Sequence, residues 1–347
     1  MSDAIRVKVL SPLAQRYFLH QLPAGVPVWG NCRFSFDPAD REYDWLVVYE
    51  DLPGLPDMPR NRRHEELACA AAHTLLATSE PSSIKHYGNP FTRQFGCVLT
   101  SQEEWALPHR DRIYSQAGLA WMYGVGTAHE RSFDDMAASP PAGKTRDLSM
   151  VFSPKRQRHT LHHRRNSFMR RLMSALPEMD VYGRGARPLD DKAEALDSYR
   201  YHVTIENHIG LHHWTEKLAD AFLGLALPFY CGCPNVTDYF PPDSFIAIDM
   251  DDPRDAVRRI RAAIAGNEYA RRLPAIIEAR RRVLYEYNFF ALVAREIEKR
   301  HGHEPSAHAP GGRIYSRHAL RRLSLAIRLE DTWGKVRARI LHRTGKQ

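Results

Sequence analysis

A group of polar and charged residues in the second half of the chain has the composition of an anion-binding site. Glu206 and Asn207 follow a β-branched run, and Thr215, Glu216 and Lys217 come after seven intervening residues, where a helical pattern begins. A helix N-terminus is already electropositive, so a lysine there makes most sense when an anion lies between the ammonium and the backbone N–H groups. The spacing therefore indicates a phosphate cradle. A plain helix surface with a solvated lysine is the alternative.

Arg165 is a second candidate cation. It stands at the start of another helical pattern and ends the stretch 155–165, which contains five Lys or Arg residues. A guanidinium can hold a diphosphate through two parallel hydrogen bonds. We expect Arg165 to act together with Lys217 if the fold brings the two side chains near each other; otherwise the stretch is a solvated loop.

The cysteines and histidines do not have the spacing of a metal site. Among the five cysteines, Cys231 and Cys233 are close, but this Cys-Gly-Cys has no second pair at the spacing that zinc needs. The histidine pairs 162–163 and 212–213 are adjacent, whereas helical metal ligands are four residues apart. We predict no metal site and a reducing compartment.

Continuous apolar runs in the first half are typical of parallel strands that are covered on both faces of a sheet. Between two of these runs, the stretch Arg63–Ala72 favours a helix. The alternation indicates an α/β architecture. The predicted strands are Ile5–Leu10, Trp45–Tyr49, Thr74–Thr78 and Cys97–Thr100.

A second α/β series follows the residues 137–144, whose alanines, prolines and glycine are typical of a linker between domains. We predict two doubly wound α/β domains, over residues 1–140 and 141–308, with a ligand cleft between them at the carboxyl ends of the strands. The second series has strands at Leu148–Phe152, Asp180–Tyr182, Tyr201–Ile205, Leu227–Tyr230 and Phe245–Ile248, and helices at Asn166–Leu176, Trp214–Leu225, Arg254–Ala265 and Tyr269–Arg300, the last interrupted near Pro274 and Asn288.

Composition sets further bounds. The chain has 347 residues, of which 43% are hydrophobic and 26% are charged, which excludes disordered, collagen-like, coiled-coil and disulfide-stapled classes. No apolar run approaches the roughly 18 residues that a membrane span needs, and the N-terminus lacks a signal-peptide core. These features predict a soluble, cytoplasmic protein.

The net charge of +8 is concentrated in the tail, residues 309–347. From Arg313 to Gln347 there are ten basic and two acidic residues, while the other 312 residues carry 39 charges of each sign. Leu329, Trp333, Val336 and Ile340 recur at helical spacing. A basic amphipathic helix with a tryptophan favours an anionic membrane surface; a helix that packs back on a domain is the alternative.

The stretch 201–246 resembles the donor-binding region of the α-1,3-fucosyltransferases, glycosyltransferase family 10, of bacterial type. Similarity extends more weakly to the segment that begins at Arg165. The motifs that carry the resemblance are Glu206-Asn207, Thr215-Glu216-Lys217-Leu218, Asp220-Ala221-Phe222, Pro228-Phe229-Tyr230-Cys231-Gly232, Asp238-Tyr239-Phe240-Pro241 and Ser244-Phe245-Ile246.

The resemblance implies a GT-B arrangement of two Rossmann-like domains and an inverting transfer of fucose from GDP-fucose to a sugar hydroxyl, without a metal or other cofactor. Lys217 and Arg165 would neutralise the departing diphosphate, and Glu216 would hold the ribose. Asn207 would contact the phosphate or the sugar, with Glu206 in the same donor-binding group.

His213 stands where many members of the family have a tyrosine, so the resemblance also places it at the donor, with a changed guanine or ribose contact.

Inversion also requires a base for the acceptor hydroxyl. The family keeps an acidic residue after an N-terminal-domain strand and before a proline or serine. Glu80, in Thr-Ser-Glu-Pro-Ser, fits that place and is the candidate base. The rivals are Glu103 and Glu104, which follow the next predicted strand.

The resemblance and the tail together predict a fucosyltransferase of surface polysaccharide, lipopolysaccharide or protein glycosylation, peripheral on the inner face of the membrane. Its partners would be a GDP-sugar, a glycan or lipid-linked glycan acceptor, and the membrane surface. One alternative is a GT-B transferase that uses another nucleotide sugar. The other is a basic nucleic-acid-binding protein, which the neutrality of residues 1–312 disfavours.

Overall fold

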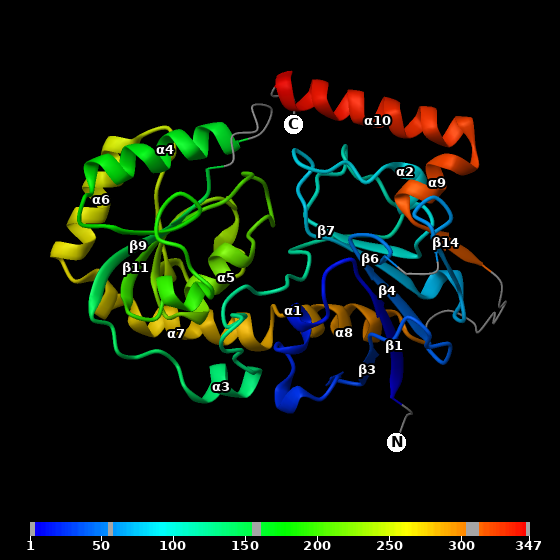
Figure 1. Cartoon of the computed structure of the whole chain (residues 1–347), viewed down its shortest axis with the longest axis horizontal. Helices are drawn as coiled ribbons and strands as arrows, with labels where there is room; N and C mark the ends of the chain where they lie inside the picture. The colour runs from blue at the N-terminus through cyan, green and yellow to red at the C-terminus, as the bar shows by residue number, and fades with distance from the viewer. Residues whose placement is uncertain (1–3, 55–57, 155–160, 303–311, 345–347) are drawn as a thin grey trace. The chain divides into compact units, whose positions relative to one another are not determined.

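The computed structural model describes residues 4–54, 58–154, 161–302 and 312–344 (Figure 1). The chain forms two compact units. Unit 1 comprises Met1–Leu22, Val26–Gly118 and Phe289–Gln347, and unit 2 comprises Pro23–Gly25 and Leu119–Asn288. The predicted boundary at 140/141 therefore falls inside unit 2, and the predicted boundary at 308 lies outside the described residues.

Unit 1 contains a seven-stranded sheet in the order β2-β3-β1-β4-β6-β7-β8, parallel except for the pairing of β2 with β3. The four strands predicted from apolar runs are confirmed with the same bounds, because each is buried on both faces. The elements of this half are β1 Ile5–Leu10, α1 Arg16–Leu19, β2 Val28–Trp29, β3 Cys32–Ser35, β4 Trp45–Tyr49, β6 Thr74–Thr78, α2 Asn89–Thr92, β7 Cys97–Thr100 and β8 Arg112–Tyr114.

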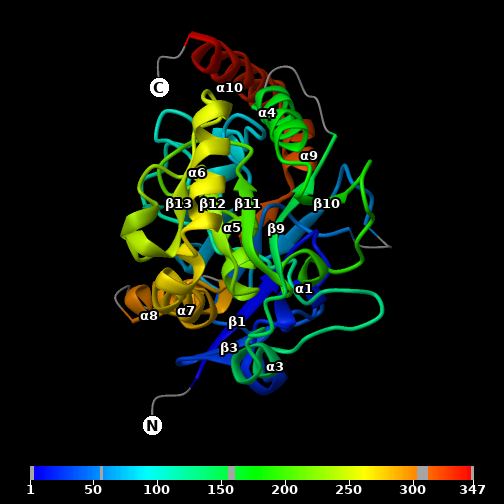
Figure 2. The same cartoon turned by 90° about the vertical axis from the view of Figure 1, so that its left-hand side faces the viewer.

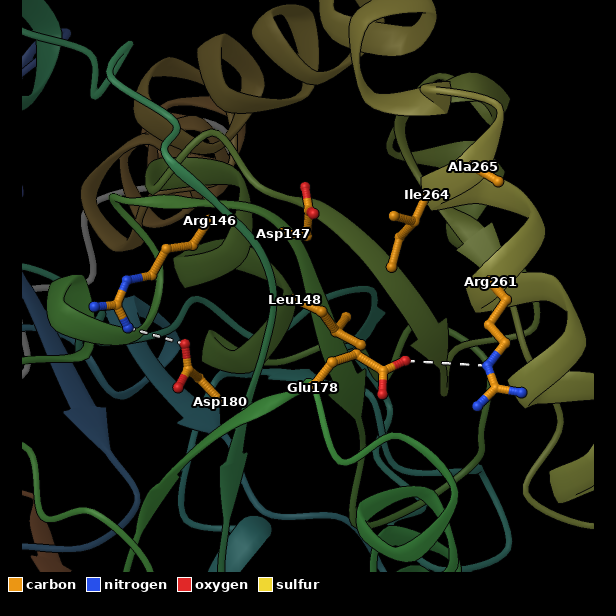
Figure 3. A pocket seen from close by; sticks show the side chains of 8 residues that line it. All are labelled: Arg146, Asp147, Leu148, Glu178, Asp180, Arg261, Ile264 and Ala265. Atoms are coloured by element: carbon orange, nitrogen blue, oxygen red, sulfur yellow. Dashed lines mark hydrogen bonds and ion pairs between the residues drawn. The ribbon is translucent and has the colours of Figure 1, made fainter.

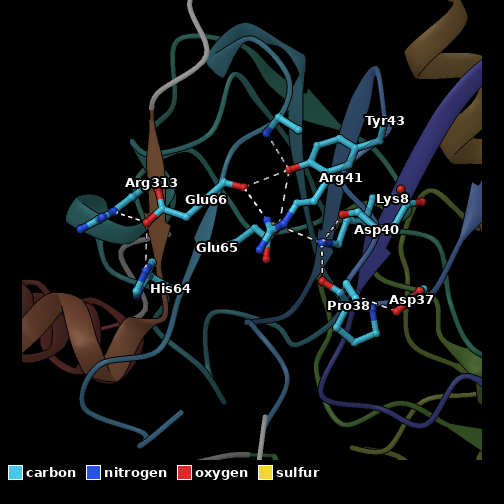
Figure 4. Close-up of polar contacts among 12 residues, drawn as sticks. Lys8, Asp37, Pro38, Asp40, Arg41, Tyr43, His64, Glu65, Glu66 and Arg313 are labelled. Carbon is cyan, nitrogen blue, oxygen red and sulfur yellow. Dashed lines mark hydrogen bonds and ion pairs between the residues drawn. The ribbon is translucent and has the colours of Figure 1, made fainter. Parts of the chain in front are cut away.

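The helix predicted over Arg63–Ala72 is wrong. This stretch forms the short strand β5 (His64–Glu66), which pairs with β14 (Arg313–Tyr315) far away in the sequence. Glu65 is buried beside Lys8 of β1. The ammonium of Lys8, which is fully buried, donates a hydrogen bond to the Glu65 carboxylate at 2.8 Å (Figure 4). A buried ion pair and a non-local strand pairing thus override the local helical preference.

The C-terminal segment completes unit 1. Phe289, at the start of α8 (Phe289–Arg300), packs against Phe18 and Tyr49, and Ile314 joins the core of the sheet. α9 (Arg317–Leu323) and α10 (Leu325–Thr344) follow, and both contact α2. Residues 312–344 therefore pack on unit 1 and do not form the separate tail that the sequence predicted.

The helix α10 has a packed side and an exposed side. Asp331 is buried and forms ion pairs with Arg321 at 2.6 Å and Lys335 at 2.8 Å, and Gly334 lies against His86. The apolar residues that the sequence placed on one face stay exposed, with 61% exposure for Leu329, 68% for Trp333, 40% for Val336 and 52% for Ile340. No helix among the described residues is long and apolar enough to cross a membrane.

Unit 2 is a five-stranded, wholly parallel sheet in the order β10-β9-β11-β12-β13 (Figure 2). The predicted strands of this half are confirmed within two residues at their ends. The strands are β9 Arg146–Phe152, β10 Asp180–Gly183, β11 Tyr199–Ile205, β12 Leu227–Cys231 and β13 Ile246–Ala247. Together with unit 1, the sheet confirms the predicted α/β class with two parallel-sheet units.

Four helices pack in pairs against this sheet, α4 beside α6 and α5 beside α7. The long predicted helix breaks after Tyr285, near Asn288 as predicted, but it continues through Pro274, whose cost is offset by the buried face of Ile276 and Ala279. The helices of unit 2 are α3 Phe133–Ala138, α4 His162–Ala175, α5 Glu216–Leu223, α6 Pro253–Ala265 and α7 Glu268–Tyr285.

The stretch predicted as a linker, residues 137–144, instead ends inside unit 2. Lys144 is buried, and its ammonium donates to the carbonyl oxygens of Leu196, at 3.0 Å, and Gly224. A buried lysine that is held by two carbonyls fixes the stretch to the domain, although its composition is that of a flexible connection.

Candidate functional site

The strand order of unit 2 creates a natural place for a ligand. β9 lies between β10 and β11, so the connections that leave β9 and β11 run in opposite directions along the sheet. In open α/β sheets such a switch point, at the carboxyl ends of the strands, is where ligands bind. The residues that the sequence analysis singled out, Arg165 after β9 and the stretch 206–217 after β11, lie at this edge.

Glu206 connects the end of β11 to the start of α5. It is fully buried, and its carboxylate accepts hydrogen bonds from the backbone N–H of Thr215 at 2.8 Å and from the Thr215 hydroxyl at 2.6 Å. The Thr215 hydroxyl oxygen in turn accepts from the backbone N–H of Lys217 at 3.4 Å and caps the helix. Glu206 thus fixes where α5 begins.

Lys217 lies in the first turn of α5, and acidic groups surround its ammonium. Its Nζ is 2.8 Å from the Thr215 hydroxyl, 3.0 Å from a Glu216 oxygen and 3.3 Å from a Glu206 oxygen. Burial by itself favours the neutral forms of both partners. The positive charges of Lys217 and Lys192 nevertheless lower the pKa of Glu216 to about 2, and the two carboxylates raise the pKa of Lys217.

Arg165 occupies the first turn of α4, where its Nη1 donates a hydrogen bond to Oδ1 of Asn207. Burial lowers the pKa of its guanidinium, an effect that the charges of Glu206 and Glu216 oppose. Within the described part of the chain, Nε of Arg165 has no hydrogen-bond partner and no carboxylate forms an ion pair with the group. A largely buried guanidinium with an unused donor is suited to an anionic ligand.

These side chains meet at one cavity of about 100 Å³. We call this cavity the cation pocket. Its lining includes two predicted cations, Arg165 and Lys217, and one predicted carboxylate, Glu216. Lys192, Asp220, Ser153 and His202 also line it, without a role predicted from the sequence. The structure therefore brings Arg165, Glu216 and Lys217 together.

Lys192 and Asp220 are the site residues that sequence reasoning missed. Asp220 is buried in α5, where its carboxylate accepts from Lys192 at 2.7 Å and from the backbone N–H groups of Met122 and Tyr123, each at 3.1 Å. Burial raises the pKa of Asp220. Asp220 was part of the family-like motif without a chemical role, and nothing in the sequence marked Lys192, because it reaches the pocket from a short 3₁₀ turn (Lys192–Ala195).

His213 and Glu206 are not among the residues that line the cation pocket. His213 is buried, and its ring lies 5.3 Å from the ring of His208. The neighbouring His212 contacts the Tyr239 hydroxyl at 2.5 Å and receives a hydrogen bond from Asn235. These contacts hold the loop between Asn207 and α5, and among the described residues His213 does not line the cation pocket.

Glu80, the candidate base, lies in unit 1 directly after β6 and is partly buried. Its backbone N–H points to a carboxylate oxygen of Glu50 at 3.3 Å, and its carbonyl oxygen accepts from Gln102 at 2.8 Å. Of the rivals, Glu103 accepts a hydrogen bond from Ser82 at 2.6 Å and Glu104 is exposed.

A larger cavity of about 440 Å³ lies at the opposite, amino-terminal edge of the unit 2 sheet (Figure 3). Each of its charged groups has a partner: Arg146 pairs with Asp180 at 2.9 Å, Arg261 approaches Glu178 at 4.0 Å, and Asp147 pairs with Arg200 at 2.9 Å. The smaller cation pocket is the better candidate site, because Arg165 there has no carboxylate partner within the described part of the chain. Within the described part of the chain, no group of three His, Cys, Asp or Glu side chains is placed to hold a metal ion.

Comparison with known proteins assigns the same region to one family. Residues 142–268 match the model of the glycosyltransferase family 10 (fucosyltransferase) C-terminal region. This match covers the whole cation pocket and confirms the resemblance that the sequence motifs indicated.

Curated relatives match over short stretches. A human 4-galactosyl-N-acetylglucosaminide 3-α-L-fucosyltransferase is 34% identical over 91 residues, 24% of this chain and 25% of the relative. An α-(1,3)-fucosyltransferase of Helicobacter pylori is 36% identical over 58 residues, 17% of this chain and 12% of the relative. The match thus spans a quarter or less of the length of these relatives.

A solved α1,3-fucosyltransferase structure with GDP-fucose is similar at 15% identity and a TM-score of 0.43, over 82% of this chain and 92% of that one.

Proposed function

We propose that this chain, whose residues 142–268 carry the C-terminal region of glycosyltransferase family 10, is an inverting glycosyltransferase that moves fucose from GDP-fucose to a glycan hydroxyl. The observation that carries the proposal is the convergence of Arg165 and Lys217 on one pocket at the switch point of a parallel sheet. The names of the similar proteins, fucosyltransferases of animals and of a bacterium, support fucose as the transferred sugar.

Among the described residues, one cation of the cation pocket is left for a diphosphate leaving group. Asp220 is matched by Lys192, and Lys217 is shared between Glu206 and Glu216. Arg165 has no carboxylate partner within the described part of the chain. When the glycosidic bond breaks, negative charge develops on the β-phosphate, and fixed cations stabilise that charge most effectively in a site that excludes water.

Three further residues have roles in this proposal. Glu216, kept ionised by its two lysine neighbours, accepts hydrogen bonds from the ribose hydroxyls. Asn207 holds the guanidinium of Arg165 and faces the phosphate or the sugar. Glu80 takes the proton of the acceptor hydroxyl as that oxygen attacks the anomeric carbon, and GDP leaves from the opposite face, so the configuration inverts. Cationic side chains carry the leaving-group charge, and no metal is required.

The test is a transfer assay with GDP-fucose, GDP-mannose and UDP-galactose as donors and a panel of glycan acceptors, with mass spectrometry of the products. We expect a fucosylated product with GDP-fucose alone. In the Glu80→Gln variant we expect transfer to fall at least 100-fold while GDP still binds. Transfer from UDP-galactose, or full activity of the Glu80→Gln variant, would overturn the donor or the base assignment respectively.

We further propose that the enzyme works in the cytoplasm at the inner face of a membrane, on surface polysaccharide or lipopolysaccharide, and docks through α10. The exposed face with Leu329, Trp333 and Ile340 supplies apolar contact, and the basic residues of the helix supply charge. Each basic residue near an anionic surface contributes about 1 kcal/mol.

Sedimentation with vesicles tests this docking. We expect the chain to bind vesicles with 30% phosphatidylglycerol about tenfold better than pure phosphatidylcholine, and the double variant Trp333→Ser, Ile340→Ser to lose this binding. Ile277→Ser, which removes an equally exposed apolar side chain from α7, is the matched control. Equal binding by the double variant would contradict the proposal.

A further inference from the structure

A second carboxylate lies buried behind the candidate base. Glu50 follows directly after β4, is 8% exposed, and has a backbone φ of +71°. Such a left-handed conformation is unfavourable for a residue with a side chain and persists only where the surroundings demand it. Here the backbone N–H of Glu50 donates to the carbonyl oxygen of Ala77 in the neighbouring strand β6, at 2.9 Å, and the carboxylate points to the segment that follows β6.

The carboxylate of Glu50 holds the start of that segment. One oxygen accepts from the backbone N–H of Ser79 at 2.5 Å, from the Ser79 hydroxyl at 2.9 Å and from the backbone N–H of Glu80 at 3.3 Å. The hydroxyl of Tyr87 donates to the same oxygen, and the ammonium of Lys85 donates to the other. With this many donors, the carboxylate has little capacity left to accept a proton from a substrate.

The other side of the segment is held by the next strand. Gln102, which is buried just after β7, donates through its side-chain nitrogen to the carbonyl oxygen of Glu80 at 2.8 Å and to that of Lys85 at 2.9 Å. The residue Glu80 is therefore fixed at its N–H by Glu50 and at its carbonyl by Gln102. Both groups come from strands that flank β6 in the sheet.

Burial opposes ionisation of Glu50, but the charge of Lys85 and the hydrogen bonds of Lys85, Tyr87 and Ser79 lower the pKa of this carboxyl below its usual value. Glu50 is thus an anion at neutral pH, and charge-assisted hydrogen bonds to backbone amides are the stronger kind.

We propose that Glu50 is a positioning residue of the transfer reaction: by holding the amides of Ser79 and Glu80, it sets the place of the Glu80 carboxylate. This inference rests on the proposed role of Glu80 as the base. Misplacement of a reacting group by about 1 Å costs on the order of 100-fold in rate, so loss of the anchor should appear in kcat rather than in donor binding.

The test compares Glu50→Gln with Glu65→Gln as a matched control. Glu65 is another buried carboxylate of unit 1; it forms an ion pair with Lys8 and lies away from Glu80 in the sequence. For Glu50→Gln we expect kcat, normalised to the number of GDP-binding sites, to fall 10- to 100-fold, with KM for GDP-fucose within twofold of the parent. For Glu65→Gln we expect kcat to stay within threefold.

Hydrogen exchange gives a readout that does not depend on activity. The amides of Ser79 and Glu80 should exchange at least tenfold faster in Glu50→Gln and at an unchanged rate in Glu65→Gln. Glu50→Asp, which keeps the charge but withdraws the carboxylate by one methylene, should lie between the parent and Glu50→Gln in both measurements, and it serves as the test if Glu50→Gln does not fold.

The outcomes separate the two claims. An unchanged kcat in the Glu50 variants, or an equal loss in Glu65→Gln, overturns the positioning role. Full activity of Glu80→Gln together with loss in Glu50→Gln overturns the base assignment, and with it the claim that Glu50 acts by positioning Glu80. Faster exchange at Ser79 and Glu80 without any transferase activity in the parent overturns the proposed function and leaves the anchor in place.

Discussion

The side chain of Arg165 donates a hydrogen bond to the side-chain oxygen of Asn207, which joins the first turn of α4 to the loop after β11. The two segments meet because β9 and β11 are adjacent parallel strands, so the chain that follows each strand emerges at the same edge of the sheet. The Arg165 guanidinium is thereby oriented before any ligand arrives, and its Nε stays available within the described part of the chain.

Arg165 should contribute directly to nucleotide affinity. Arg165→Met is expected to weaken GDP binding about 10- to 100-fold, since a hydrogen bond to a charged group is worth roughly 1.5–3 kcal/mol. Arg165→Lys should recover only part of the loss, because an ammonium lacks the planar fork. The neighbour Arg164, half exposed and paired with Asp251, is the matched control: titration calorimetry on Arg164→Met should give the parent affinity, and an equal loss there would contradict the assignment.

Asp220 should matter for stability more than for binding. Asp220→Ala leaves the ammonium of Lys192 and the backbone N–H groups of Met122 and Tyr123 without their acceptor, so we expect the free energy of unfolding in urea to fall by about 3–5 kcal/mol. Asp243→Ala, at an exposed carboxylate of the same unit, should cost less than 0.5 kcal/mol on the same scale. Equal midpoints for the two variants would refute this account of Asp220.

Gly232 should not tolerate a side chain. A Cβ at this position would lie 2.5 Å from Cγ of Glu206 and 2.5 Å from the Tyr230 hydroxyl, so Gly232→Ala must displace the carboxylate that fixes the start of α5. We expect a loss of about 1–3 kcal/mol in stability, from overpacking, together with weaker GDP binding. Gly143→Ala, where a Cβ meets nothing within 4 Å, is the control; parent-like GDP affinity in Gly232→Ala would contradict the prediction.

The packing of α10 should weaken in acid. His86 lies against Gly334, and burial lowers its pKa to about 4, although Asp331 opposes the shift. A histidine whose folded pKa lies below its unfolded value of about 6.5 stabilises the fold above pH 6.5, and this contribution is lost as the pH falls from 6.5 towards 4. Unfolding free energies measured across this window should therefore decrease less steeply with acidification in His86→Gln than in the parent. Identical pH slopes would show that His86 does not carry the effect.

The strands were predictable because their causes are local. Runs such as Trp45–Tyr49 are buried on both faces, so every residue in them is apolar and the bounds could be read directly. The place of Lys217 in the pocket was predictable because a lysine at the start of a helix, which is already electropositive, indicates that negative charge lies nearby. The sequence pattern did not indicate that Glu206 and Glu216 would already surround its ammonium.

The predictions that failed depend on contacts between residues far apart in the sequence. The stretch 63–72 has helical character, yet Lys8 draws Glu65 into a buried ion pair and β14 supplies a strand partner. Lys192 carries no local signal, because its position in the cation pocket depends on Asp220 in another element. The charge pattern of the tail predicted an amphipathic helix correctly, but the burial of Asp331, which fixes that helix to unit 1, is a tertiary effect.

The central claim is that the cation pocket binds a guanosine diphosphate sugar through Arg165 and Lys217. Titration calorimetry with GDP, UDP and ADP, on the parent chain and on Lys217→Met, tests it most directly. We predict that the parent chain binds GDP at least tenfold more tightly than UDP or ADP. We also predict that Lys217→Met binds GDP about 10- to 100-fold more weakly than the parent chain does. Equal affinities for the three nucleotides, or parent-like GDP binding by Lys217→Met, would contradict the claim.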